Sequence, residues 1–398
     1  MSRPRQFSRI ARELAEQYPV LTVTGPRQSG KTTLCRAVFP DHAYVNLEPL
    51  DRREFARQDP RGLLTEHPDG LIVDEVQRVP ELLSYIQEAV DEDSRPGRYV
   101  LTGSQHFSLS QSISQSLAGR TAILQLLPLS LEEYADFDIP TDDLYSVLFA
   151  GAYPRIHDRG LSPQRWLADY LATYIERDVR QIANVSNLSA FGNFLRLCAA
   201  HTAQEVNLSG LGADAGVSHN TARAWLSILE TSFLVIQCPA WHRNIRKQLV
   251  KRPKLHFLDS GLACHLLGIR SPDELRHHPL RGAIFESWVA SEIYKHHTHR
   301  GQRPELLHYR ESRGAEIDIL VQSGTELIAC EAKSGATLHA DFFRHLEQFS
   351  ERMALINPRP KLINRLVYGG DQSQRRSGID CLGWRRMHER SWVREATI

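Results

Sequence analysis

The segment Gly25-Pro-Arg-Gln-Ser-Gly-Lys-Thr32 restricts the possible folds of this chain more than any other feature. It fills every fixed position of the phosphate-binding loop of nucleoside triphosphatases, and it directly follows the apolar run Val20–Thr24. We therefore predict a buried strand, then a glycine turn whose backbone N–H groups face phosphate oxygens, then a helix. The alternative is a glycine turn that carries a lysine by chance. It leaves the strand pattern before the loop and the helix pattern after it unexplained.

The loop predicts a site for a nucleoside triphosphate and Mg²⁺. Lys31 is expected to reach the β- and γ-phosphates as a catalytic residue, and the Thr32 hydroxyl is expected to ligate Mg²⁺. No base-reading motif is visible, so these residues do not separate ATP from GTP. The expected nucleotide-binding residues are Gly25, Pro26, Arg27, Gln28, Ser29, Gly30, Lys31, Thr32 and Thr33.

A second motif ends the apolar run 70–73. Asp74 and Glu75 are adjacent carboxylates, and we expect Asp74 to hold Mg²⁺ and Glu75 to polarise the attacking water. Two acidic residues that cap the next helix are the alternative, and the upstream loop favours the nucleotide site. A further strand ends in Thr102 and Ser104, which either sense the γ-phosphate or form a turn and helix cap.

Strands alternate with helices in the first third of the chain, which predicts an α/β domain. A parallel sheet covered on both faces would place the site at the carboxyl edge of the strands, and we assign residues 1–135 to this P-loop NTPase domain. ATPases of this kind often take an arginine from a neighbouring subunit, so a homo-oligomer is compatible with the sequence. Arg120 and Arg177 are the candidate arginines, and surface salt bridges are the alternative role for both.

The length of 398 residues predicts two or three domains, because one domain usually takes about 100 to 200 residues. Hydrophobic residues at 41% and charged residues at 24% exclude a largely disordered chain. The net charge of +1 means that any contact with nucleic acid depends on local basic patches. The six cysteines form no C-x-x-C pair, so neither a zinc site nor a disulfide framework is predicted. No apolar run has the length of a signal peptide or a membrane span, so we expect a soluble, cytoplasmic protein without membrane contact.

The middle of the chain divides into two patterns. Residues 136–200 have helical spacing typical of a lid or connector. Residues 201–270 have the pattern of a winged helix, in which a short helix, a glycine turn and the N-cap Ser218 precede a second amphipathic helix. We therefore predict a helical connector followed by a winged-helix domain.

Two apolar runs after the second helix enclose a basic segment that resembles a wing. Its basic residues are Arg243, Arg246, Lys247, Lys251, Arg252 and Lys254. One interpretation is duplex binding, with Asn220, Thr221 and Arg223 facing a groove and the basic tip touching phosphates. The other is a protein-packing module whose charges are simply solvated.

The C-terminal part carries a second set of charged residues. Asp318 and Glu331 lie in apolar runs joined by 322–325, typical of a hairpin, so the two carboxylates are expected to meet on adjacent strands. Glu331 and Lys333 are two positions apart and point to one face of a strand. Two carboxylates for Mg²⁺ with a lysine beside them suit metal-assisted phosphodiester hydrolysis, and Glu286 in a helix is a further candidate ligand. The alternative is a surface ion pair on an exposed sheet face.

Together these motifs resemble a family of prokaryotic ATPases, related to the AAA+ and STAND groups, that are fused to a C-terminal domain of PD-(D/E)XK nuclease type. The order of the motifs matches as well. The residues that carry the resemblance are Gly25 to Thr33, LIVDE at 71–75, LTGS at 101–104, GAYP at 151–154, YIERD at 174–178, LDSGL at 258–262, GAIFE at 282–286, EID at 316–318 and EAK at 331–333.

The resemblance implies a restriction-endonuclease-like α/β fold for residues 271–398 and DNA as a partner. It implies an ATP site made of Lys31, Thr32, Asp74 and Glu75. For the nuclease-type site it implies catalytic roles for Asp318, Glu331 and Lys333, with Glu286, Asp318 and Glu331 as metal ligands. Asp259 recurs in the resemblance, and we interpret it as the N-cap of a helix that begins at Ser260. A nucleotide-dependent switch that binds DNA or a partner protein without cleaving it is the alternative function.

Overall fold

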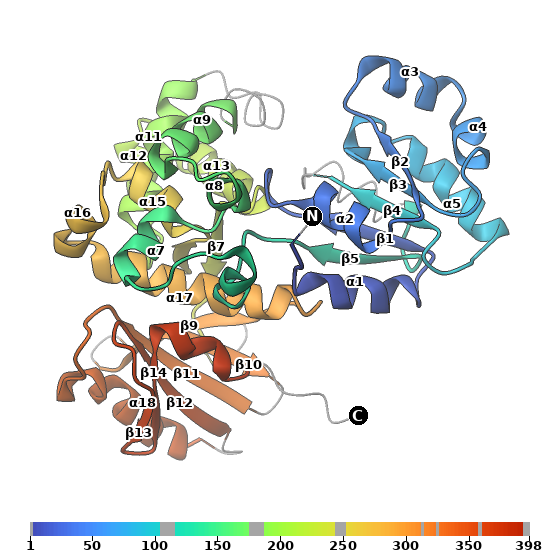
Figure 1. The fold of residues 1–398 in the computed structure, drawn as a ribbon. Helices are drawn as coiled ribbons and strands as arrows, with labels where there is room; N and C mark the ends of the chain where they lie inside the picture. Colours follow the sequence, from blue (N-terminus) through green and yellow to red (C-terminus); the bar gives the residue numbers. More distant parts are fainter. Residues whose placement is uncertain are drawn as a thin grey trace. The chain divides into compact units, whose positions relative to one another are not determined.

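The computed structural model describes residues 3–103, 116–174, 187–242, 252–311, 314–323, 326–356 and 360–392, which form two compact units (Figure 1). Unit 1 consists of residues Met1–Leu129 with the short segments Thr231–Phe233 and Thr298–Gln302. Unit 2 contains the rest of the chain. Among the described residues, no helix is long and apolar enough to cross a membrane.

Unit 1 is built on a five-stranded sheet in which every neighbouring pair is parallel. In spatial order its strands are β2 (Ala43–Asn46), β3 (Leu71–Asp74), β4 (Tyr99–Thr102), β1 (Val20–Thr24) and β5 (Thr121–Gln125). The first four coincide with apolar runs of the sequence, and the predicted parallel α/β sheet is confirmed. This arrangement is that of a P-loop NTPase core.

Helices cover both faces of this sheet (Figure 1). On one face, α1 (Phe7–Ala15) and α2 (Lys31–Val38) share a core with Leu21 and Val23 of β1. On the other, Val20 shares a core with three further helices, because successive side chains of a strand alternate. Those helices are α3 (Leu50–Gln58), α4 (Pro60–Thr65) and α5 (Leu82–Glu92). A single 3₁₀ turn, η1 (Val76–Arg78), follows β3.

The first part of unit 2 is a helical layer with a small antiparallel sheet, ordered β6 (Gln204–Glu205), β8 (Lys254–Phe257), β7 (Val235–Cys238). Its core is aromatic: the ring of Trp225 meets those of Phe191 and Phe194 edge-on at centroid distances of 5.2 and 5.5 Å. The helices are η2 (Leu131–Phe137), α7 (Leu144–Ala150), α8 (Pro154–Asp158), α9 (Pro163–Tyr174), α11 (Leu188–Ala200), α12 (Leu208–Asp214), α13 (His219–Thr231), α15 (Ser260–Leu266) and α16 (Pro272–His277).

Helices α12 and α13 form the predicted helix pair. Gly216 has a φ of 72°, which glycine adopts without strain, and the backbone N–H of Thr221 donates to Oγ of Ser218 at 3.2 Å. The predicted serine N-cap is therefore confirmed. The hydroxyls of Thr221 and Ser218 are hydrogen-bonded to each other at 2.9 Å, and Asn220 and Arg223 are exposed.

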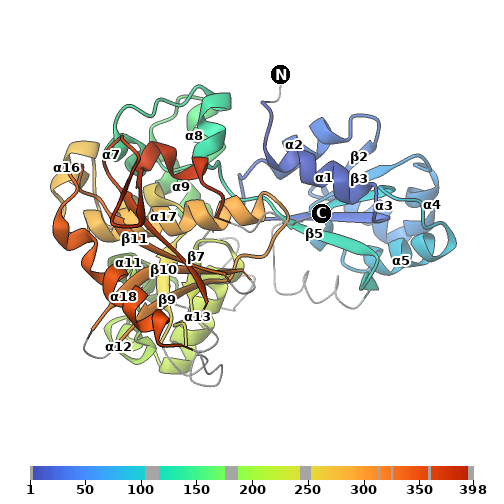
Figure 2. The same cartoon turned by 90° about the horizontal axis from the view of Figure 1, so that it is seen from below.

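The second part of unit 2 is a six-stranded mixed sheet with α18 (Arg344–Ala354) packed on it (Figure 2). Its strands in spatial order are β13 (Gln374–Arg376), β14 (Ile379–Gly383), β12 (Lys361–Tyr368), β11 (Glu326–Lys333), β10 (Glu316–Ser323) and β9 (Leu306–Arg310). Strands β10 and β11 pair antiparallel, with Ile319 opposite Cys330. Long helix α17 (Arg281–Thr298) precedes the sheet, and the 3₁₀ turn η5 (Trp384–Glu389) follows β14.

Asp259 caps α15, as the sequence predicts. Its Oδ1 accepts from the backbone N–H of Leu262 at 2.8 Å, and its Oδ2 accepts from that of Ala152 at 2.7 Å. A Cβ on Gly261 would come within 2.9 Å of the Ala150 carbonyl, so only glycine allows α15 to approach the end of α7 this closely. All six cysteines are free thiols and all are buried.

Candidate functional site

The phosphate-binding loop connects β1 to α2 and contains two glycines with positive φ. Gly25 has a φ of 144°, and a Cβ there would collide with the backbone oxygen of Leu126. Gly30, with a φ of 94°, immediately precedes the first turn of α2, and Gln28 also has a left-handed φ of 63°. These left-handed conformations allow a tight turn between β1 and α2, the kind of loop whose backbone N–H groups can surround a phosphate.

Lys31 is buried at the start of α2. Its Nζ donates to the carbonyl oxygens of Gly25 at 3.0 Å and Pro26 at 2.8 Å, so the ammonium group lies inside the loop. Burial lowers the pKa of Lys31 to about 8, although the carboxylates of Glu75 and Asp74 act in the opposite direction. A cation held at this place has little water around it and interacts strongly with any phosphate that enters.

Asp74 ends β3 and collects three hydroxyl groups. Oδ2 accepts from Thr32 at 2.9 Å and from Tyr44 at 2.7 Å, and Oδ1 accepts from Thr102 at the end of β4. The structure thus brings together Thr32, Asp74 and Thr102, which the sequence singled out. Tyr44 was missed, since a tyrosine on a short strand gives no signal in the sequence.

Glu75 follows Asp74 with a φ of 58°, a left-handed conformation that few residues other than glycine adopt. Its side chain is half-buried and accepts from the amide of Gln77. The adjacent carboxylates therefore have different surroundings. Asp74 is fixed by three donors, whereas Glu75 is held by Gln77 at the edge of the site.

These residues fit a Mg²⁺–nucleotide. The cation prefers hard oxygen ligands, and the Thr32 hydroxyl and the Asp74 carboxylate would supply them beside the phosphate-binding loop. Lys31 would supply positive charge for the β- and γ-phosphates. Of the remaining loop residues, Arg27 and Ser29 lie between β1 and α2, and Thr33 lies in the first turn of α2.

Arg5 was not anticipated, yet it braces the loop. Its guanidinium donates to the backbone oxygen of Ser29 and to that of Leu127, both at 3.0 Å, and the side chain is buried. Arg120 forms an ion pair with Asp91 at 2.6 Å, the surface role that the sequence gave as an alternative. Ser104 and Arg177 lie outside the described residues.

The predicted C-terminal residues also meet. Asp318 on β10 and Glu331 on β11 are in contact: the backbone N–H of Asp318 donates to Glu331 Oε1 at 3.3 Å. Nζ of Lys333 lies 2.6 Å from Glu331 Oε2 and 3.3 Å from Asp318 Oδ2. Only 1% of the Glu331 side chain is exposed, so this cluster is not a surface ion pair.

Lys254 is a fourth member of the cluster, and its place corrects the interpretation of this residue as part of a basic wing. It lies on β8 with 3% of its side chain exposed. Nζ is 3.0 Å from Glu286 Oε1 on α17, 3.0 Å from Glu316 Oε1 and 3.5 Å from Asp318 Oδ1. The pattern of basic residues predicted that the Lys254 side chain contacts solvent or DNA. In the structure it points toward the carboxylates of Glu286, Glu316 and Asp318 instead. Residues 243–251, the rest of the predicted tip except Arg252, lie outside the described residues.

The carboxylates of the cluster differ in the direction in which their pKa is shifted. Burial raises the pKa of Glu331, and the nearby charge of Asp318 raises it further. The pKa of Glu286 is raised for the same two reasons. Burial also acts to raise the pKa of Asp318, but Lys333 and Lys254 outweigh it and hold that pKa below its usual value. Asp318 is thus the carboxylate that holds its negative charge most firmly.

The cluster in this arrangement does not fit a metal ion. Among the described residues, no group of three or more His, Cys, Asp or Glu side chains is placed to hold one. The carboxylates of Glu286, Glu316 and Asp318 surround an ammonium group instead. The metal-ligand roles expected for Glu286, Asp318 and Glu331 therefore stay predictions.

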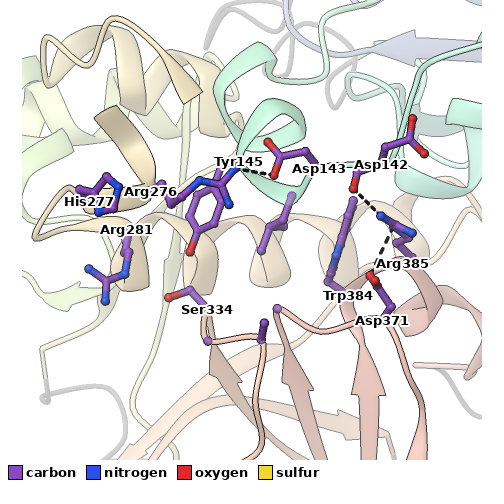
Figure 3. Close-up of a pocket in the computed structure, with 14 residues that line it drawn as sticks. Asp142, Asp143, Tyr145, Arg276, His277, Arg281, Ser334, Asp371, Trp384 and Arg385 are labelled. Atoms are coloured by element: carbon purple, nitrogen blue, oxygen red, sulfur yellow. Dashed lines mark hydrogen bonds and ion pairs between the residues drawn. The ribbon is translucent and has the colours of Figure 1, made fainter. Parts of the chain in front are cut away.

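Unit 2 also contains a polar pocket of about 400 Å³ (Figure 3). Arg276 pairs with Asp143 at 2.8 Å, and Arg385 pairs with Asp371 at 3.5 Å. The carboxylate cluster does not line it, and its arginines are largely matched by aspartates. The lining residues are Asp142, Asp143, Leu144, Tyr145, Arg276, His277, Arg281, Ser334, Gly335, Ala336, Gly369, Asp371, Trp384 and Arg385.

Three family models match the chain in succession. A model described as an AAA domain matches residues 17–135, which contain the parallel sheet and the phosphate-binding loop. Two models described as domains of unknown function match residues 141–273 and 281–387. Residues 17–135 therefore match an AAA domain, and the phosphate-binding loop lies within the matched segment.

Two uncharacterised proteins, from Mycobacterium tuberculosis and Mycobacterium bovis, are each 30% identical to this chain over 335 residues, which is 83% of this chain and 73% of the relative. Among solved structures, the chain is similar to a Walker-type ATPase of Pyrococcus abyssi, with 18% identity over 66% of this chain and 95% of that chain and a TM-score of 0.44. It is also similar to the RuvB Holliday junction branch migration motor of Thermotoga maritima, with 20% identity, coverage of 61% and 92%, and a TM-score of 0.31.

Proposed function

We propose that this chain, which belongs to the same family as the two uncharacterised mycobacterial proteins, is an ATPase whose hydrolysis cycle controls a DNA-contacting, nuclease-like unit. The observation that carries the proposal is the convergence of Lys31, Thr32 and Asp74 at one edge of the parallel sheet. A lysine cation, a hydroxyl and a carboxylate meet there beside a tight turn that contains two glycines with positive φ. This set of groups suits a triphosphate with its cation.

Each group has a distinct task in hydrolysis. Lys31 and the loop N–H groups bind the phosphates, and Thr32 with Asp74 would hold Mg²⁺, which neutralises charge on the phosphates. We assign the orientation of the attacking water to Glu75, the carboxylate next to Asp74. Asp74, which three hydroxyl groups hold in place, would bind the cation. Glu75, which accepts from the amide of Gln77, would act as the base.

The ATPase proposal is tested by phosphate release from the purified full chain. We expect Mg²⁺-dependent turnover in the wild type, and we expect Lys31→Ala to bind the nucleotide more weakly and to lose turnover. Arg9→Ala is the matched control, because Arg9 is an exposed cation on α1 with 87% of its side chain accessible. Turnover in Lys31→Ala equal to that of the wild type would overturn the proposal.

DNA contact is supported by the order of elements in the first part of unit 2. Helix α11, strand β6, helices α12 and α13, and strands β7 and β8 follow one another in the order of a winged helix. Arg223 is exposed near the start of α13, where a recognition helix contacts DNA. We expect Arg223→Ala to weaken binding of a labelled duplex and to reduce the salt slope by about one, as loss of a phosphate contact does. Arg165→Ala on α9, another exposed arginine of unit 2, is the control.

A second candidate is a nucleotide-dependent switch that binds DNA without cutting it. The observation that favours it is Lys254, which lies among the carboxylates that a cleavage site would use for its metal. Plasmid, linear and single-stranded DNA are incubated with wild type, Lys31→Ala and Lys333→Ala, with and without Mg²⁺ and ATP. Mg²⁺-dependent cutting lost in Lys333→Ala supports the nuclease, and intact ATPase without cutting on any substrate supports the switch.

A further inference from the structure

Lys254 reaches the C-terminal carboxylates from a different part of the fold. Strand β8 belongs to the small sheet with β6 and β7, whereas Glu286 lies on α17 and Asp318 on the mixed sheet. The lysine is separated from these two residues by 32 and 64 positions. A lysine with 3% of its side chain exposed exchanges its water shell for carboxylate oxygens, which stabilise the buried charge.

The distances in the cluster are those of hydrogen-bonded ion pairs. Nζ lies 3.0 Å from Glu286 and from Glu316, and 3.5 Å from Asp318. Mg²⁺ binds carboxylate oxygens at about 2.0–2.1 Å, so a cation at the same place would need the oxygens drawn inward and the ammonium removed. The lysine and a divalent cation therefore exclude each other.

Asp318 is held by two lysines at once. Oδ1 faces Lys254 at 3.5 Å, and Oδ2 faces Lys333 at 3.3 Å. The two lysines differ in exposure, with 30% of the Lys333 side chain accessible against 3% for Lys254. Lys333 therefore flanks the cluster at its accessible side, and Lys254 occupies its interior.

We infer that Lys254 is a built-in counter-cation of this cluster, and that it excludes divalent cations such as Mg²⁺ or Mn²⁺ until it is displaced. The inference deepens the proposed function only for the nuclease-like unit, because the ATP site in unit 1 is separate. Lys254 is a positioning residue here. It screens the repulsion among these carboxylates without touching a substrate.

The test counts Mn²⁺ bound to the nucleotide-free full chain, from the paramagnetic resonance of the free ion. We expect Lys254→Met to bind Mn²⁺ at least roughly tenfold more tightly than the wild type, a factor that the loss of one competing charge readily supplies. The gain should vanish in Lys254→Met with Asp318→Asn. Lys333→Met is the matched control and should gain less, since its ammonium lies at the accessible side.

Thermal unfolding gives a second readout. Lys254→Met leaves buried carboxylates without their cation, so its Tm should be lower than that of the wild type, and Mn²⁺ should raise it again. If this variant does not fold, wild type and Asp318→Asn still decide the question. Equal Mn²⁺ binding by these two supports the inference, and weaker binding by Asp318→Asn overturns it, because the wild type would then already hold the metal there.

Equal Mn²⁺ affinity of the wild type and a folded Lys254→Met would also overturn the inference. The Mn²⁺-binding test of this inference can fail or succeed independently of the tests of the proposed function. Uptake of Mn²⁺ by Lys254→Met without DNA cleavage supports the counter-cation and counts against the nuclease. Loss of turnover in the ATPase assay bears on unit 1 alone.

Discussion

The hydroxyl of Thr32 donates a hydrogen bond of 2.9 Å to Oδ2 of Asp74, although 42 positions separate the two residues. Thr32 lies in the first turn of α2 and Asp74 at the end of β3, so this contact joins the two nucleotide motifs into one site. Because the strands are parallel, their carboxyl ends meet at one edge of the sheet. The functional residues are gathered by topology rather than by proximity in the sequence.

Thr102→Val tests the support of Asp74 from β4. The substitution keeps the size and branching of the side chain but removes the donor to Oδ1, so the carboxylate loses one of its three hydroxyl partners. We expect Mg²⁺-dependent turnover to fall about 10- to 100-fold, the usual effect of losing an outer-shell partner of a metal ligand. Thr102→Ser restores the donor and should restore turnover. Equal turnover in all three proteins would contradict this.

Glu75→Gln separates nucleotide binding from hydrolysis. The amide cannot take a proton from water, so kcat should fall by roughly 10²–10⁴, while ATP affinity measured with a fluorescent analogue should change little. Glu81→Gln is the control, because Glu81 is a half-exposed carboxylate that pairs with Arg57 at 3.2 Å. A parallel loss of affinity in Glu75→Gln would mean that this residue binds the nucleotide instead.

ATP affinity should depend on pH through Lys31. Burial lowers the pKa of this lysine to about 8 before nucleotide binds, and only the protonated form attracts phosphate. Affinity should therefore be highest below pH 8 and fall as pH rises, approaching about tenfold per pH unit once the lysine is mostly neutral. Calorimetric titration of the wild type and Lys31→Ala at several pH values is the measurement. The variant lacks the titrating group, so its weaker affinity should stay flat between pH 8 and pH 9.5.

Asp259→Ala should destabilise unit 2. The substitution leaves the buried N–H groups of Leu262 and Ala152 without their acceptor, at a cost of about 1–3 kcal/mol in the free energy of unfolding. Asp259→Asn keeps one carbonyl oxygen and should cost less. Urea unfolding followed by tryptophan fluorescence suits this test, because all six tryptophans of the chain lie in unit 2. An unchanged midpoint in Asp259→Ala would show that the cap contributes no stability.

Most residues of the nucleotide site could be predicted because the motifs that identify them are short and continuous in the sequence. A strand, a loop and a helix start within a dozen residues define it, and the acidic pair after β3 is contiguous with its strand. Tyr44 and Arg5 could not be predicted in the same way. Their contacts with Asp74 and with Leu127 join residues that are 30 and 122 positions apart.

Lys254 shows most clearly where sequence reasoning fails. It closes a run of basic residues, and charge alone predicts exposure for all of them. The strand decides which way the Lys254 side chain points. β8 is the central strand of its small sheet, and Lys254 and His256 lie two positions apart, so their side chains point to the same face of that sheet. Both side chains are buried. The carboxylates that stabilise the ammonium group of Lys254 come from elements much later in the chain. The sequence around Lys254 therefore gives no signal for these partners.

Because all six cysteines are buried, the rate at which each thiol reacts with an alkylating reagent reports local opening of the structure around it. Burial raises the pKa of Cys35 and of Cys198 to about 12, so these thiols stay neutral and shielded from alkylating reagents while the native packing holds. Modification of a given thiol then measures how often its surroundings open. Cys35 on α2 reports for unit 1 and the other five for unit 2, so the rate at Cys35 with and without ATP would follow the phosphate-binding helix with no probe added.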